Sequence, residues 1–147
     1  LCRSIGVSNF TIENLKELEE KYDVLPAINQ VEFHPYHYQK ELLEYCNSKN
    51  IIIEAYSPLV HAKRMDEPRL MAISDELGKT PAQVLIRWAI QRGMVVLPKS
   101  VNQDRIVENF AVFDFDISNS LMKRLDDLDE RYVTCWDPHN PPPYAPV

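Results

Sequence analysis

Strand-like and helix-like segments alternate along this chain of 147 residues, and the alternation restricts the folds open to it more than any other feature. Short apolar runs that favour β-structure begin near Ile5, Ala27 and Ile51, about 24 residues apart, and a fourth covers residues 94–97. The segments between them place apolar residues at helical spacing. Repeated strand–helix units of this kind predict a parallel sheet covered by helices.

Several helices have recognisable ends in the sequence. Thr11 and Thr80 are typical N-caps, Pro81 suits the first helical position, and Gly78 is typical of the residue that follows a helix. We predict strands at residues 5–7, 27–33, 51–55 and 94–97, a loop at 59–67, and helices that begin at Thr11 and Thr80 or cover 39–48, 68–77, 102–109 and 118–128.

Four strands leave the type of sheet open. A closed barrel needs eight strands and typically ~250 residues, so the chain is either about half a barrel or an open doubly wound sheet. A dinucleotide site in the second fold uses a glycine-rich turn, whereas Gly6, Gly78 and Gly93 form no cluster. The chain begins at Leu1, without Met, and enters a strand almost at once, so we expect it to be part of a longer protein.

Charge and composition disfavour some partners. The net charge is −6, with 45% hydrophobic and 26% charged residues. An acidic chain is poorly suited to nucleic acid or anionic membrane, and no apolar run approaches the ~20 residues of a membrane span. Cys2, Cys46 and Cys135 are odd in number and widely spaced, which favours a reducing, cytoplasmic setting.

The segment at residues 97–109 predicts an anion site. A short strand ends in Pro98, and the cations Lys99 and Arg105 flank the start of a predicted helix. Ser100 and Asn102 can add hydrogen bonds, and the N–H groups of a helix N-terminus favour a phosphate. Because the rest of the chain is acidic, this positive charge is local and suits a phosphorylated small molecule.

Polar and aromatic residues follow the other predicted strands. Ser8, Asn9 and Gln30 could hold a planar carboxamide, Tyr56 offers a face for a flat heterocycle, and Ser57 could approach a pyrophosphate. Each also has a structural explanation: a turn before a helix for Ser8 and Asn9, a satisfied polar group for Gln30, and core packing for Tyr56. Their order along the chain, from the carboxamide end to the phosphate end, favours a dinucleotide site.

Five stretches of the chain resemble the second half of the aldo-keto reductases: GVSNF, NQVEFHPY, AYSPL, PAQVLIRW and LPKSVNQDRIVENF. These are NADPH-dependent carbonyl reductases built on a parallel (β/α)8 TIM barrel. The resemblance covers nearly the whole chain and implies about four βα units, a C-terminal helix and a tail. Residues 1–131 would then be the NADPH-binding half of the barrel, and residues 132–147 the tail that forms part of the substrate loop.

The resemblance also implies roles for individual residues. Ser8, Asn9 and Gln30 would bind the nicotinamide carboxamide, Tyr56 would stack on the nicotinamide ring, and Ser57 and Leu59 would lie beside the pyrophosphate. The ribose 2′-phosphate and its surroundings would contact Lys99, Ser100, Val101, Asn102 and Arg105, and the adenine would contact Glu108 and Asn109. The two cations favour NADPH over NADH. Trp136 would line an apolar substrate pocket, or would anchor the tail to the barrel rim.

The family's catalytic Asp, Tyr, Lys and His lie upstream of GVSNF, so none of those positions exists in this chain. We therefore expect the full-length protein to reduce an aldehyde or ketone, with the upstream half of the barrel as partner, and this segment alone to be inactive. The alternative is a non-catalytic, NADPH-binding regulatory or truncated barrel. A half-barrel alone would expose unpaired strand edges and would be poorly soluble or pair with itself.

Two other kinds of site remain open at this point. His34, His37 and Cys46 include a spacing seen in zinc sites, although no fourth ligand is apparent, so we predict no metal. Glu32 and Glu54 lie at comparable positions near the ends of successive strands, as the two carboxylates of a glycosidase would. Their structural alternative is that they orient polar neighbours at the barrel mouth.

Overall fold

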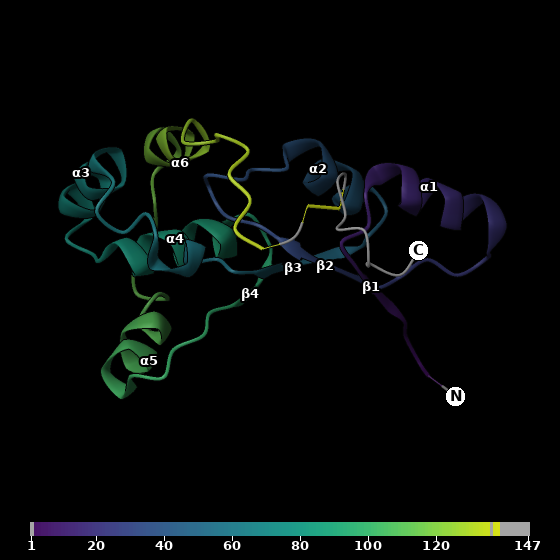
Figure 1. Cartoon of the computed structure of the whole chain (residues 1–147), viewed down its shortest axis with the longest axis horizontal. Helices are drawn as coiled ribbons and strands as arrows, with labels where there is room; N and C mark the ends of the chain where they lie inside the picture. Colours follow the sequence, from purple (N-terminus) through teal and green to yellow (C-terminus); the bar gives the residue numbers. More distant parts are fainter. Residues whose placement is uncertain (1, 136, 139–147) are drawn as a thin grey trace.

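The computed structural model describes residues 2–135, 137 and 138. Its sheet has four parallel strands whose order in space follows their order in the sequence. These strands are β1 (Gly6–Ser8), β2 (Ile28–Glu32), β3 (Ile52–Tyr56) and β4 (Val95–Leu97). Each strand pairs with the next, as Figure 1 shows, so the parallel sheet predicted from the alternating pattern is confirmed.

The predicted helices are also present, with ends that differ from the expected ones by a few residues. They are α1 (Ile12–Lys21), α2 (Lys40–Ser48), α3 (Pro68–Leu77), α4 (Pro81–Gln91), α5 (Gln103–Phe110) and α6 (Asn119–Asp126). The prediction of a plain loop at residues 59–67 was wrong in part, because η1 (Val60–Ala62) is a short 3-10 helix. Backbone hydrogen bonds from Val60 to Ser57 (2.9 Å) and from Ala62 to Leu59 (2.8 Å) wind this turn.

The chain buries one face of the sheet under its helices. Val31, Ile53 and Ala55 point to this face and are at most 2% exposed. Figure 1 shows α1, α2 and α6 on the same side of the sheet. The opposite face is open: Ile52 is 47% exposed and Val95 is 43% exposed. A doubly wound sheet has helices on both faces, whereas helices on one face and sequential strand order are the arrangement of a partial (β/α)8 barrel.

The helix caps follow the sequence signals. The Thr11 side chain accepts a hydrogen bond from the backbone of Asn14, whose side chain bonds back to Thr11. Thr80 and Gln83 form the same reciprocal arrangement at the start of α4. Gly78 ends α3 with φ +62°, a left-handed conformation that glycine adopts without steric cost.

Replacing Thr11 by Ala removes the cap of α1, and we expect it to lower the free energy of unfolding of the protein by about 1 kcal/mol. Urea unfolding measures this change. The Lys16→Ala variant, in an exposed position on the same helix, should change the midpoint much less. Equal midpoints for the Thr11 variant and the parent would show that the cap does not stabilise the protein.

Candidate cofactor site

Polar side chains from the first three strands form one connected group, because the carboxyl ends of parallel strands share an edge of the sheet. Ser8 Oγ donates to the carbonyl of Gln30 (2.9 Å), and the backbone N–H of Asn9 donates to the same carbonyl (2.9 Å). The Tyr56 hydroxyl donates to Asn9 Oδ1 (3.0 Å). The structure therefore brings Ser8, Asn9, Gln30 and Tyr56 together.

The turn that carries Asn9 has support that the sequence analysis missed. Asn29 is fully buried, and its side-chain amide donates to the carbonyl of Phe10 (2.9 Å) while its oxygen accepts from the Phe10 N–H (3.3 Å). This two-way contact holds Asn9 in a left-handed conformation with φ 57°. A lone Asn at a helix-facing position of an apolar strand was the signal that could have identified it.

Nearby acids act on two side chains of this group, Gln30 and Tyr56. Gln30 Nε2 donates to a Glu54 oxygen, so Glu54 orients a polar neighbour, as the structural alternative for these acids predicted. Burial, together with the nearby Glu32 carboxylate and Cys135, raises the pKa of Tyr56 to about 12, although the hydrogen bond to Asn9 opposes the shift. The Tyr56 hydroxyl therefore stays protonated and its neutral ring remains available as a stacking surface.

A strained turn follows β3. Ser57 has φ 50°, and Val60, His61 and Ala62 also have positive φ, which is uncommon for residues other than glycine. Ser57 Oγ lies 3.1 Å from His61 Nε2 and 3.2 Å from Cys135 Sγ, and those two atoms are 3.1 Å apart. The sequence analysis gave no site role to the histidine or the cysteine, which is 78 residues from Ser57.

A cavity of about 870 Å³ extends from this turn to α5. It is bordered by η1, the start of α4 and the loop after β4. The predicted cofactor residues that line it are Ser57, Leu59, Lys99, Ser100, Val101, Asn102, Arg105, Glu108 and Asn109. The same cavity also contacts Met65 and Thr80, which the sequence analysis did not assign to the site. The lining does not include the connected group of Ser8, Asn9, Gln30 and Tyr56. That group lies beside the cavity, because Tyr56 is followed directly by Ser57, which lines it.

Two polar side chains of the loop before α5 also make local hydrogen bonds. Ser100 and Asn102, which were expected to donate hydrogen bonds to an anion, each accept one from a backbone N–H. Asn102 Oδ1 accepts from the Arg105 backbone N–H (3.1 Å), and Ser100 Oγ accepts from the Asn102 N–H (3.1 Å). The capping oxygen of Asn102 therefore satisfies one of the free N–H groups at the start of α5.

The two cations of this loop are available to a ligand. Lys99 and Arg105 are exposed, and no ion pair within 4 Å involves either of them among residues 2–135, 137 and 138. Glu108, in contrast, accepts a hydrogen bond from the Thr80 hydroxyl, and Asn109 is buried. The α5 end of the cavity therefore carries Lys99 and Arg105, which pair with no acid among the described residues, next to Glu108 and Asn109, which are held in place.

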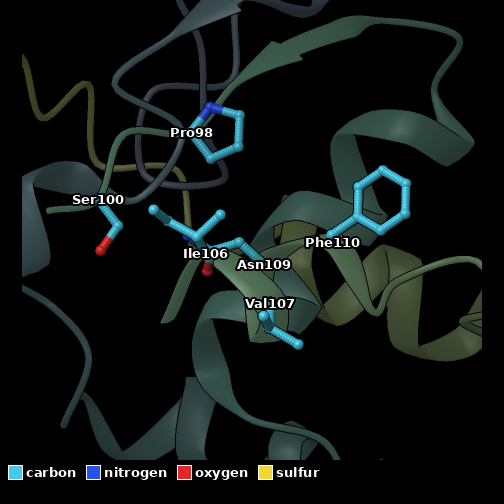
Figure 2. Close-up of a pocket in the computed structure, with 6 residues that line it drawn as sticks. All are labelled: Pro98, Ser100, Ile106, Val107, Asn109 and Phe110. Carbon is cyan, nitrogen blue, oxygen red and sulfur yellow. The ribbon is translucent and has the colours of Figure 1, made fainter. Parts of the chain in front are cut away.

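A second hollow of about 430 Å³ lies on the other side of α5, and Figure 2 shows the residues that line it. Ser100 and Asn109 border both spaces. Figure 2 also shows Ser100 and Phe110 on opposite sides of Ile106. Ile106 is 53% and Phe110 is 75% exposed, so this hollow is an apolar surface at the open β4 side of the half-barrel.

Three further sequence hypotheses concern Trp136, a metal site and a membrane-spanning helix. Trp136 lies outside the described residues. Within the described part of the chain, no group of three or more His, Cys, Asp and Glu side chains could hold a metal ion. His34 instead lies 3.1 Å from a Glu32 oxygen, and Cys46 belongs to the hydrophobic core. In the same residues no helix is long and apolar enough to cross a membrane.

The half-barrel sheet, with a cavity along its carboxyl edge, defines a protein of the (β/α)8-barrel class. The model of the Aldo/keto reductase family matches residues 1–130, and the chain belongs to that family. It is 44% identical over 137 residues to an uncharacterized oxidoreductase of Schizosaccharomyces pombe, covering 92% of this chain and 50% of that protein. It is 45% identical over 131 residues to the glyoxal reductase of Bacillus subtilis, covering 88% of this chain and 48% of that protein.

Solved structures agree with this assignment. The aldo-keto reductase MGS-M4 from a deep-sea metagenome library superposes with a TM-score of 0.88 at 36% identity, covering 94% of this chain and 53% of that one. A variant of Gox0644 in complex with NADPH gives a TM-score of 0.87 at 38% identity, covering 93% and 51%. The chain thus spans about half the length of the relatives it matches.

Proposed function

We propose that this chain is the cofactor-binding half of an NADP(H)-dependent reductase that converts an aldehyde or ketone to an alcohol. The observation that carries the proposal is the cavity that runs from Ser57, the residue directly after Tyr56, to Lys99 and Arg105. Beside its Ser57 end lies the Tyr56 ring with its amide partner Asn9, and its other end offers two cations that pair with no acid among the described residues. A nicotinamide dinucleotide with a ribose 2′-phosphate has matching chemistry at its two ends.

In this proposal the chain's residues bind and orient the cofactor. Ser8, Asn9 and Gln30 hold the carboxamide, and Tyr56, neutral because of its raised pKa, covers one face of the ring. The bound nicotinamide supplies the hydride that reduces the carbonyl carbon. The cofactor's remaining groups lie along the cavity lining, in contact with Ser57, Leu59, Lys99, Ser100, Val101, Asn102, Arg105, Glu108 and Asn109.

The proton that completes the alcohol would come from outside this chain. We propose that the other half of the barrel supplies it, so that residues 1–131 bind cofactor and residues 132–147 contribute to the substrate side, with Trp136 on the apolar pocket. The family model ends at residue 130, which supports this division. The free thiols of Cys2, Cys46 and Cys135 support a reducing, cytoplasmic location.

The test uses the full-length protein with NADPH and a panel of small carbonyl compounds that includes glyoxal, the substrate named by one relative. We expect NADPH binding, seen as quenching of protein fluorescence, and consumption of one NADPH per alcohol formed. Binding without consumption of NADPH for any aldehyde or ketone would support the alternative, a regulatory NADPH-binding barrel. Absence of binding would exclude both.

A further inference from the structure

A buried carboxylate at the end of β2 holds the C-terminal segment in place. Glu32 accepts hydrogen bonds from the backbone N–H groups of Thr134 (2.8 Å) and Cys135 (3.1 Å), and from the Thr134 hydroxyl. Nε2 of His34 lies 3.1 Å from the same carboxylate. Glu32 lies on the open face of the sheet, opposite to the helices, and yet is only 2% exposed. Thr134 and Cys135, about 102 positions later in the chain, cover it.

The Glu32 carboxylate is negatively charged at neutral pH. Burial alone raises the pKa of Glu32, but the hydrogen bonds from His34, Thr134 and Cys135 outweigh it and lower the pKa to about 2. The segment has a second attachment, since the carbonyl of Tyr36 accepts from the backbone N–H groups of Glu130 (3.2 Å) and Tyr132 (2.8 Å). The chain from residue 130 to residue 135 therefore follows a fixed path across the end of β2.

This path brings the C-terminal segment into contact with two residues of the cavity wall. Cys135 Sγ lies 3.2 Å from Ser57 Oγ and 3.1 Å from His61 Nε2. Ser57 and His61 both line the 870 Å³ cavity, at the end that adjoins Tyr56. The Cys135 thiol thus packs directly against two side chains that line this end of the cavity.

We propose that Glu32 is a positioning residue that fixes residues 132–135 as a cover over the Ser57 end of the cavity and so slows the exchange of a dinucleotide bound there. The attachment of residues 132–135 follows from contacts within this chain. The effect on dinucleotide exchange rests on the proposed function, because it requires that NADPH occupy the cavity. The two parts are therefore measured separately.

The experiment uses the full-length protein and three variants. Glu32→Gln keeps the shape of the side chain but replaces one accepting oxygen by an amide that cannot accept from N–H donors. Thr134→Val removes one hydroxyl and leaves both backbone donors in place. The control, Glu19→Gln, makes the same chemical change at a half-exposed carboxylate that pairs with Lys49, and it should alter neither readout by more than about twofold.

The first readout is the rate at which iodoacetamide alkylates Cys135 without cofactor, followed by mass spectrometry of its peptide. The second is the NADPH dissociation rate, measured by chase with excess NADP+. In Glu32→Gln we expect alkylation to rise at least about tenfold and dissociation at least about fivefold, because a charge-assisted set of hydrogen bonds is lost. Thr134→Val should raise both by a smaller factor.

The outcomes separate the two parts of the proposal. Unchanged Cys135 alkylation in both variants would show that Glu32 does not hold the segment. Faster alkylation with unchanged NADPH dissociation would show that the segment does not cover the cofactor. If the parent protein does not bind NADPH, the proposed function fails, while alkylation still decides the role of Glu32. Cys46 is buried, with its pKa raised to about 11, so its alkylation would reveal an unfolded variant, and Thr134→Val then decides.

Discussion

Replacing Lys99 and Arg105 together by Met is expected to weaken NADPH binding by about a hundredfold or more and NADH binding by less than about threefold. A hydrogen bond to a charged group contributes about 1.5–3 kcal/mol, and every 1.4 kcal/mol corresponds to tenfold in affinity. Both side chains are exposed, and neither belongs to an ion pair in the described residues, so their charges are not already neutralised. NADH lacks the 2′-phosphate and therefore loses little.

The measurement is the dissociation constant of each cofactor for the full-length protein, obtained by fluorescence titration at fixed ionic strength. Each single substitution should cost NADPH about tenfold. Lys123→Met is the matched control, since Lys123 is an exposed cation on α6 that pairs with Asp127 and is absent from the cavity lining. Equal losses for NADPH and NADH in the double variant would place the 2′-phosphate elsewhere and would contradict the proposed orientation of the dinucleotide.

Local signals in the sequence were enough to predict much of the fold. Thr11, Thr80 and Gly78 act within one helical turn, so their roles depend on nearby residues that the sequence displays directly. The parallel sheet could be inferred from the repeated strand–helix pattern. The strand–helix pattern alone left a barrel and a doubly wound sheet open, because the choice depends on which face of the sheet the helices cover. The resemblance to the aldo-keto reductases already implied the barrel, and the structure agrees with it.

In the candidate site, too, local features could be predicted from the sequence, whereas contacts between distant residues could not. Lys99 and Arg105 stand close together in the sequence, so this pair of cations could be recognised there. Asn102 stands directly before the predicted helix, a local position typical of an N-cap, and its oxygen does cap α5. The contacts of Glu32 with Thr134 and of Ser57 with Cys135 join residues 102 and 78 positions apart, and no local pattern encodes them.

Residues 1–147 produced alone are expected to show no NADPH-dependent carbonyl reduction and to self-associate, whereas the full-length protein is expected to be active and stable. The physical reason is the open face of the sheet. Ile52, Val95 and Leu97 are 40–47% exposed on it, and β1 and β4 each have one unpaired edge in the described sheet. Exposed apolar strands with free edges favour pairing with another chain.

Analytical ultracentrifugation and a reductase assay test this expectation on the same preparation. Ile52→Lys should reduce self-association of the isolated segment, because it places a charge on the open face, and should destabilise the full-length protein, in which another part of the barrel would cover that face. Met71→Lys, at an exposed position on α3, should do neither. A monomeric, cooperatively melting and active segment would show that the proton donor lies within these residues, and the division of labour between the two halves of the barrel would have to be abandoned.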